Sequence, residues 1–281
     1  MIRILTDSMS DLTQEDASRL GITVLPMPVS FGEEERWEGV DLSREEFFAR
    51  LRVAEELPKT SCVPPEKFLE AYNRLLAQPE DEILCITGSS KLSGCYQAAL
   101  MARESCSDPA RVTVVDSLNA TAAEALLVIL AAEKRDSVGS VAELAAYVEE
   151  LKKHHKVTGH TPTLKYLVMG GRLNPVVGKV GAALNIRPML KIEGGEISQA
   201  GLCRGAAKTR SWYVEQLKQF PPDKRYPIIL AGADCPAQVA ELRQLLEGSG
   251  LDLPEIRSME IGCIIGTHVG PDLTLATWIQ A

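Results

Sequence analysis

Short apolar runs along the chain alternate with longer segments in which apolar residues recur every three or four positions. Residues 2–5, 83–87 and 112–115 form apolar runs of strand length. After residue 65, apolar positions follow at helical spacing, which predicts a helix with one face on a core. Strands that alternate with helices in this way are typical of an α/β unit with a mostly parallel sheet.

Residues suited to helix ends indicate where the helices begin and stop. Thr13, Ser43 and Ser140 each precede a helical pattern, and an acidic residue follows three positions later. A side-chain oxygen at such a position accepts a hydrogen bond from a free N–H group of the first turn. We therefore expect helices that start just after these three residues, and Gly21 predicts the end of the first one.

The pattern changes near residue 157. The elements predicted beyond it are short helices over 163–169 and 176–183, a hairpin over 187–198, helices over 205–219 and 236–246, and strands over 226–230, 255–261 and 273–279. A loop over 266–271 separates the last two strands. These elements predict a second α/β unit with a mixed sheet. We expect two domains, 1–156 and 157–281, with a ligand site in the cleft between them.

Composition and charge exclude several classes of protein. The net charge of −8 argues against nucleic-acid binding. No apolar run reaches the length of a membrane span, and the chain opens on a strand in place of an apolar secretion signal. The seven cysteines are scattered, with no C-x-x-C pair, which argues against a disulfide framework and against a cysteine-ligated zinc site. These features predict a cytoplasmic protein without a metal.

Basic residues gather in one window despite the acidic balance. Residues 165–210 contain eight Lys or Arg residues and two Glu residues. Such a window suits an anionic ligand or partner, and it equally suits a solvated face. The sequence leaves both interpretations open.

The segment 89–99 is a strand-to-helix corner crowded with hydroxyl groups and small residues. A helix start presents free N–H groups, so the corner could hold a small anion such as a carboxylate, with Ser93 as a donor. The alternative is that its hydroxyl groups only cap the helix. Cys95 could be a nucleophile at this helix start, although packing as a small buried residue is the favoured interpretation.

Two other strand ends and one histidine suggest a different chemistry. Asp7 and Asp116 each lie at the end of a predicted strand, where catalytic carboxylates often lie. Each is followed by a serine, however, and an Asp-Ser pair is also common in turns. His268 has small, flexible neighbours and could face a cleft or serve structure alone. Together these three residues allow a stand-alone phosphotransferase or hydrolase. Motifs of a phosphate-binding loop are absent, which argues against ATP or NAD binding by those routes.

Five motifs, in order from the first strand to the last loop, resemble those of the DegV family. They are Thr6-Asp7-Ser8 with Asp11-Leu12, Thr60-Ser61 before a proline-started helix, Ser89-Ser90-Lys91-Leu92-Ser93-Gly94 with Tyr96-Gln97, Gly170-Gly171-Arg172, and Gly266-Thr267-His268-Val269-Gly270-Pro271. The resemblance implies two α/β domains with a long-chain fatty acid in a tunnel between them. It implies a carrier with no catalytic residue and no cofactor.

The resemblance also implies residue roles and partners. The fatty-acid carboxylate would be held by Thr60, Ser61 and Ser93, near His268. A separate ATP-dependent kinase subunit would phosphorylate that carboxylate. Arg172 and Arg204 match regions linked to contact with the kinase or with a membrane surface.

The chain departs from the family pattern at three places near the implied site. Cys62 and Val63 stand where the family commonly has Gln-Pro, and Cys95 stands where it commonly has threonine. Asp272 replaces a glycine after Gly270-Pro271. If the Asp272 carboxylate faced the site, it would repel a bound carboxylate.

Overall fold

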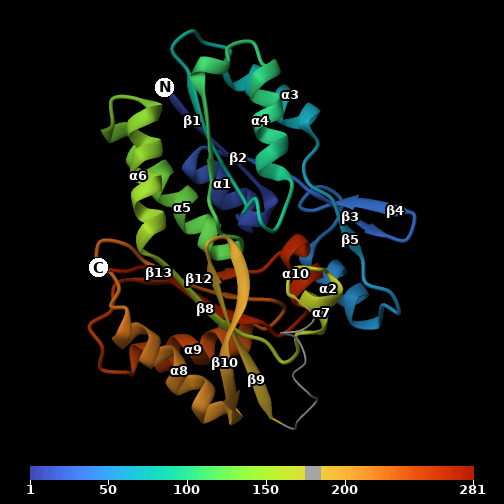
Figure 1. Ribbon diagram of the computed structural model, residues 1–281, viewed down its shortest axis with the longest axis vertical. Helices are drawn as coiled ribbons and strands as arrows, with labels where there is room; N and C mark the ends of the chain where they lie inside the picture. The colour runs from blue at the N-terminus through green and yellow to red at the C-terminus, as the bar shows by residue number, and fades with distance from the viewer. Residues whose placement is uncertain (175–184) are drawn as a thin grey trace.

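The computed structural model describes residues 1–174 and 185–281, and the helix expected over 176–183 lies outside this range. Its elements form two α/β layers and a small lateral sheet (Figure 1). The α/β class expected from the alternating pattern is confirmed.

The first sheet is parallel throughout and has the strand order β2-β1-β6-β7. Its strands are β1 (Ile2–Asp7), β2 (Ile22–Leu25), β6 (Glu82–Thr87) and β7 (Val112–Asp116). The helices around it are α1 (Gln14–Leu20), α3 (Pro65–Leu75), α4 (Cys95–Ser105), α5 (Thr121–Lys134) and α6 (Val141–His154). Figure 1 shows α3 and α4 on one side of β1 and α5 and α6 on the other.

The predicted helix starts are confirmed. Thr13 caps α1, and its side chain accepts a hydrogen bond from the backbone N–H of Asp16. Ser43 and Ser140 cap α2 (Arg44–Val53) and α6 in the same way. Gly21 ends α1 with a φ of +62°, a left-handed conformation that glycine adopts without strain.

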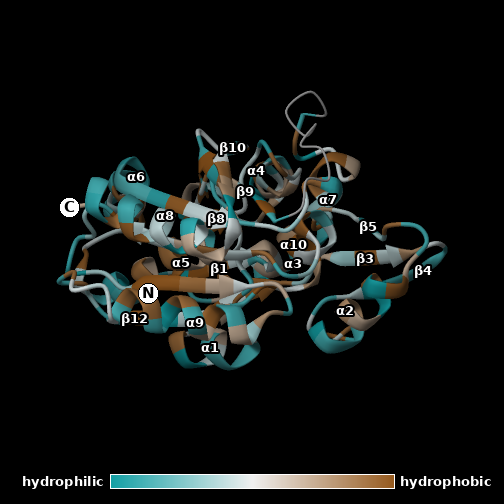
Figure 2. Cartoon of the chain, turned by 90° about the horizontal axis from the view of Figure 1, so that it is seen from below, coloured by the Kyte–Doolittle hydropathy of each residue, from teal (hydrophilic) through white to brown (hydrophobic). Residues whose placement is uncertain are grey.

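Helix α5 lies between the two main sheets. Its residues 121–132 are all buried, and it contacts strands of both sheets. A helix covered on every side needs apolar residues on every side, which explains its nearly continuous apolar run. Figure 2 shows hydrophobic residues concentrated on β1 and α5, with hydrophilic ones on α2 and α6.

The second sheet is mixed, as expected, and has the strand order β10-β9-β8-β13-β11-β12. Its strands are β8 (His155–His160), β9 (Ile186–Glu193), β10 (Glu196–Arg204), β11 (Ile228–Gly232), β12 (Ile256–Glu260) and β13 (Thr274–Ile279). Helices α8 (Gly205–Gln219) and α9 (Pro236–Glu247) accompany it. The expected hairpin is present as β9 and β10, and Ser89 Oγ donates a hydrogen bond to Gly195 O in its turn.

A third sheet, with the order β4-β3-β5, extends from the side of the molecule. It contains β3 (Pro28–Phe31), β4 (Glu34–Trp37) and the short β5 (Lys59–Thr60). The sequence patterns did not predict this sheet. Pairing of Val29 with Thr60 fixes the start of the segment that carries Thr60 and Ser61.

The expectation of a loop over 266–271 is wrong for residues 266–269, because these residues belong to helix α10 (Cys263–Val269). The backbone N–H of Gly262 donates to Asp11 Oδ1 at 2.9 Å, and that of Cys263 donates to Glu38 Oε1 at 2.7 Å. These acceptors come from the other end of the chain. No local side chain caps the start of α10, so no residue pattern nearby indicates where this helix begins.

The main hydrophobic core spans both sheets. It includes Leu5 and Leu126 from the first layer and Ile229 and Leu275 from the second. The chain passes from α6 into β8 at residue 155, close to the expected domain boundary at 156. The boundary itself stays a prediction. Within the described residues, no helix is long and apolar enough to cross a membrane.

The carboxylate of Glu38 offers a test of how α10 is held. Glu38→Ala removes the acceptor of two buried N–H groups, so we expect the free energy of unfolding to fall by about 1–3 kcal/mol. Urea denaturation measures this. Glu35→Ala, at an exposed position in β4 three residues before Glu38, should leave the stability unchanged within about 0.5 kcal/mol. Equal effects of the two substitutions would contradict the assigned role of Glu38.

Candidate functional site

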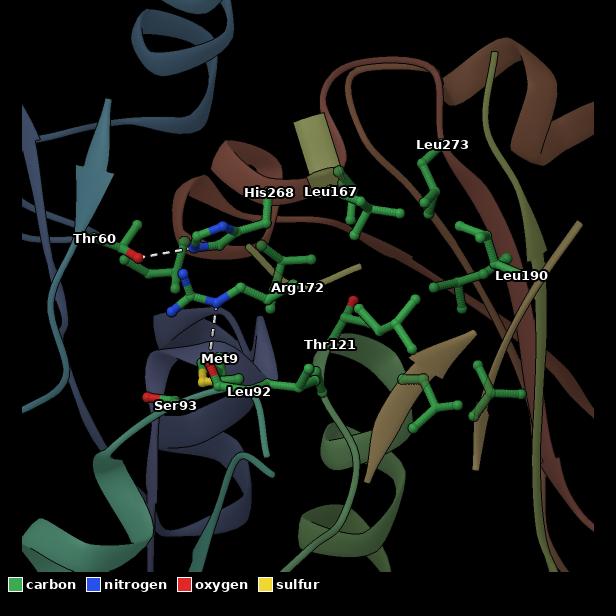
Figure 3. Close-up of a pocket in the computed structure, with 18 of the residues that line it drawn as sticks. Met9, Thr60, Leu92, Ser93, Thr121, Leu167, Arg172, Leu190, His268 and Leu273 are labelled. Atoms are coloured by element: carbon green, nitrogen blue, oxygen red, sulfur yellow. Dashed lines mark hydrogen bonds between the residues drawn. The ribbon is translucent and has the colours of Figure 1, made fainter. Parts of the chain in front are cut away.

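A cavity lies where the strand ends of the first layer face the second sheet. Its apolar wall is formed by side chains from both layers: Met9, Met27, Leu92, Leu167, Leu190, Ile192, Ile197, Ile265, Leu273 and Leu275. Thr60, Ser61, Ser93, Arg172 and His268 also line it. Figure 3 shows Thr60, His268, Arg172 and Ser93 gathered toward one side and Leu190 and Leu273 on the other. The cavity therefore has a polar end and an apolar body.

Thr60 and His268 join two distant parts of the chain at the polar end. Thr60 Oγ1 lies 2.9 Å from His268 Nε2, although the residues are 208 positions apart. Thr60 is placed by β5, and His268 by the last turn of α10. The hydrogen bond therefore connects the small lateral sheet to the helix whose start is held by Asp11 and Glu38.

His268 is neutral at physiological pH. Burial and, as a smaller cause, the charge of the nearby Arg172 guanidinium lower the pKa of its imidazole to about 4. Its Nδ1 is buried and has no hydrogen-bond partner among the described residues. A Cβ atom on Gly170 would lie 2.4 Å from this Nδ1, so a residue without a side chain is needed there.

The Arg172 side chain places a positive charge at the polar end of the cavity (Figure 3). Its Nε donates to Leu92 O at 3.1 Å, and its Nη1 donates to Gly170 O at 2.6 Å. Burial lowers the pKa of the guanidinium. The family resemblance suggested Arg172 as a contact with the kinase or with a membrane surface but did not place it in the cavity. The preceding Gly170-Gly171 was the available signal.

Ser93 and Ser61 are also brought to the cavity, as expected. Ser93 Oγ accepts from the backbone N–H of Cys95 at 3.3 Å and lies 3.4 Å from Cys95 Sγ. Ser93 therefore both supports the start of α4 and lines the cavity. Cys95 is fully buried, and burial raises the pKa of its thiol, which agrees with packing in the core and not with a nucleophile that attacks a ligand in the cavity.

Asp7 and Asp116 lie outside the cavity lining. The Asp7 carboxylate is buried and accepts from the N–H groups of Met9 and Gly88, and burial raises its pKa to about 6. Asp116 Oδ1 accepts from the N–H groups of Ser90 and Leu118. Both carboxylates thus organise turns. The structure does not bring them to His268 in this cavity, so it gives no support to a stand-alone phosphotransferase or hydrolase.

Two other residues singled out in the sequence also lie outside the lining. Arg204 is exposed at the end of β10, next to the start of α8. The Asp272 carboxylate accepts from Gln238 Nε2 at 3.3 Å and lies 3.8 Å from Arg52 Nη1. The repulsion considered for Asp272 is therefore not supported by its position. Among the described residues, no group of three or more His, Cys, Asp or Glu side chains could hold a metal ion.

Residues 1–280 match the family model described as an uncharacterised protein of the DegV family. The chain belongs to the DegV family. A relative from Thermotoga maritima named a fatty acid-binding protein is 34% identical over 276 residues, which cover 96% of this chain and 94% of the relative. This DegV chain is thus similar over nearly its whole length to a protein named for fatty-acid binding.

Comparison with solved structures also supports membership of the DegV family. A DegV family protein from Thermus thermophilus, described by its fatty-acid binding, has a TM-score of 0.89 and 31% identity, with 99% of each chain covered. The Streptococcus pneumoniae fatty acid kinase B3 protein, loaded with linoleic acid, has a TM-score of 0.85 and 19% identity, with 100% of each chain covered. The second comparison shows a shared fold.

The depressed pKa of His268 predicts a pH dependence of stability. In the unfolded chain the imidazole has its ordinary pKa of 6.5, so between about pH 6.5 and 4 the unfolded state binds more protons than the folded state. The contribution of His268 to stability should therefore fall as the pH falls through this window, whereas Asp7 and Asp11, whose pKa values are raised by burial, act in the opposite direction. His155 and His160, whose pKa values are also lowered by burial, contribute in the same direction as His268.

The comparison with His268→Gln isolates the contribution of His268. Urea denaturation at several pH values should show the stability of the wild type declining relative to that of the variant between pH 6.5 and 4. His154→Gln, at an exposed helix end, serves as the matched control and should keep the wild-type slope. A His268→Gln slope equal to that of the wild type would contradict a neutral, buried His268.

Proposed function

We propose that the protein binds a long-chain fatty acid, with the acyl chain in the apolar body of the cavity and the carboxylate at its polar end. The observation that carries the proposal is a cavity with apolar walls and, at one end, hydroxyl groups, a neutral histidine and an arginine. The relatives from Thermotoga maritima and Thermus thermophilus, described by fatty-acid binding, support it.

The polar end matches the chemistry of a carboxylate. A buried carboxylate is costly unless it is paired and hydrogen-bonded. Thr60 and Ser93 supply hydroxyl groups that can rotate to donate, and Ser61 lines the same end. Arg172 supplies the positive charge, since its guanidinium is already held at the cavity wall by two carbonyl groups. His268 can donate from Nε2 once Thr60 turns toward the ligand.

The apolar body matches the chemistry of an acyl chain. Each CH₂ group removed from water contributes about 0.8 kcal/mol, so a long chain supplies most of the affinity. The lining combines aliphatic side chains with Met9 and Met27, which adapt to irregular shapes. The carboxylate end then sets the orientation of the ligand.

We further propose that the protein is a carrier that presents the fatty acid to a separate ATP-dependent kinase subunit for acyl-phosphate formation. The name of the Streptococcus pneumoniae neighbour, a fatty acid kinase B3 protein, suggests such a partner. The sequence contains no phosphate-binding loop motif. In this proposal Ser93 holds the carboxylate and performs no chemistry. Arg172 and Arg204 are candidate contacts with the kinase or with a membrane surface.

Substitutions at the polar end test the binding site. Ser93→Ala and His268→Ala should each weaken oleate binding about 10-fold or more, because a hydrogen bond to a charged group contributes about 1.5–3 kcal/mol. Ser90→Ala, at an exposed position on the same corner that does not line the cavity, is the matched control. Binding is measured by calorimetry on delipidated protein, and circular dichroism checks the fold.

The identity of the ligand is tested on the protein as purified. Mass spectrometry of an organic extract should detect a fatty acid close to one per chain, or delipidated protein should take up added palmitate or oleate. The absence of both would contradict the proposed function. Wild-type affinity in both Ser93→Ala and His268→Ala would instead contradict the placement of the carboxylate.

The carrier role predicts that chemistry requires a partner. Oleate-loaded protein incubated with ATP and Mg²⁺ should release no ADP and form no acyl phosphate. Addition of a fatty acid kinase catalytic subunit should produce acyl phosphate, trapped as the hydroxamate. Turnover by the isolated protein would contradict the carrier role and favour a stand-alone enzyme.

A further inference from the structure

Two cysteines lie on neighbouring segments at the polar end of the cavity, and the proposed binding mode uses neither of them. Cys62 follows Thr60 and Ser61 and lines the cavity, while Cys95 begins α4 beside Ser93. Both positions depart from the pattern of the family that the sequence resembles. Their joint position suggests a role of their own.

We propose that Cys62 and Cys95 are a modification site, at which a peroxide converts the two thiols to a reversible disulfide that weakens binding at the polar end. The consequence for ligand binding rests on the proposed function, whereas formation of the bond does not.

The two segments that carry the cysteines pack against each other. The backbone N–H of Val63, the residue after Cys62, donates to Cys95 Sγ at 3.4 Å. On the other side, a Cβ atom on Gly94, the residue before Cys95, would lie 3.2 Å from Cys62 Sγ. Each thiol therefore packs against the immediate chain neighbour of the other. A disulfide requires Cα atoms about 4.4–6.8 Å apart, and this packing favours such an approach.

Cys62 differs from the other cysteines in its exposure. Cys95 and the other five cysteines of the chain are buried. Cys62 is the partly exposed member of the set, and it faces the cavity.

The difference in exposure assigns the order of reaction. Cys62 meets the oxidant first, because it is the accessible thiol, and Cys95 then resolves the product from its buried position. A bound fatty acid would cover Cys62 from the cavity side. Oxidation should therefore be slower in the loaded protein than in the empty one.

The two steps balance in atoms and electrons. The Cys62 sulfur attacks one oxygen of hydrogen peroxide, the O–O bond breaks, and the products are a sulfenic acid and water. The Cys95 sulfur then attacks the Cys62 sulfur, the S–O bond breaks, and the hydroxide leaves as water with the Cys95 proton. The Asp7 carboxylate, which interacts with the Cys95 thiol, can hold that proton in transit. Two thiols lose two electrons, and the peroxide gains them.

The bond would alter the carboxylate site through Ser93. In the reduced protein Ser93 Oγ lies 3.4 Å from Cys95 Sγ and accepts from the Cys95 N–H. Drawing Cys95 Sγ toward Cys62 removes the first contact and fixes the Thr60–Ser61 segment to the start of α4. The hydroxyl donors of Thr60 and Ser93 then lose freedom to turn toward a ligand.

The experiment uses the full chain, reduced and delipidated, with and without bound oleate. After a short exposure to hydrogen peroxide, non-reducing peptide mass spectrometry should find residues 62 and 95 in one cross-linked peptide, faster in the empty protein. Oleate affinity should fall about 10-fold and return with dithiothreitol. Cys62→Ser should abolish the cross-link, whereas Cys106→Ala, at a buried cysteine outside the cavity lining, should retain it.

The measurements separate this proposal from the proposed function. Absence of the 62–95 peptide, or oxidation of Cys62 that stops at sulfinic acid, would overturn the modification site. A cross-link that leaves oleate affinity unchanged would overturn its effect on binding. If reduced protein fails to bind any fatty acid, the proposed function fails, and the peptide map still decides whether the thiols pair.

Discussion

The first turn of α10 depends on two buried carboxyl groups supplied by the opposite end of the chain. Asp11 and Glu38 accept the N–H groups of residues 262–264, which would otherwise be buried without partners. Burial and the charge of Glu38 raise the pKa of Asp11 to about 7, and burial raises that of Glu38. Arg44 lies beside the pair and opposes these shifts. The short helix that carries His268 is therefore fixed by electrostatics from the first layer.

The polar end of the cavity depends on the position in which Asp11 and Glu38 hold α10. With α10 held, His268 lies 2.9 Å from Thr60, and its ring packs against Gly170. The same turn that contains Gly170 places Arg172, which is held by Leu92 O from the corner after β6. The polar end is thus assembled from four separate segments of the chain. The apolar wall needs no such precision, because burial of apolar surface is not directional.

Several features of the fold could be predicted from the sequence because they depend on nearby residues. The capped helices after Thr13, Ser43 and Ser140 and the hairpin at Gly194-Gly195 are local patterns, and the structure confirms them. Helix α10 and the lateral sheet were missed because their partners are distant. The position of Thr60, Ser61, Ser93 and His268 at one cavity followed from the family resemblance and not from spacing. Arg172 was singled out but assigned to a different role.

The sequence by itself determined the α/β class, the change to a mixed sheet after residue 157 and the identity of the polar side chains available for a site. It could do so because periodicity, caps and turns act within a few residues. Only the tertiary structure decided which of these side chains share a cavity and that Asp7, Asp116 and Asp272 do not line it. Those outcomes depend on how the two layers pack and on contacts across as many as 251 positions, such as that of Gly262 with Asp11. Such contacts leave no periodic signal in the chain.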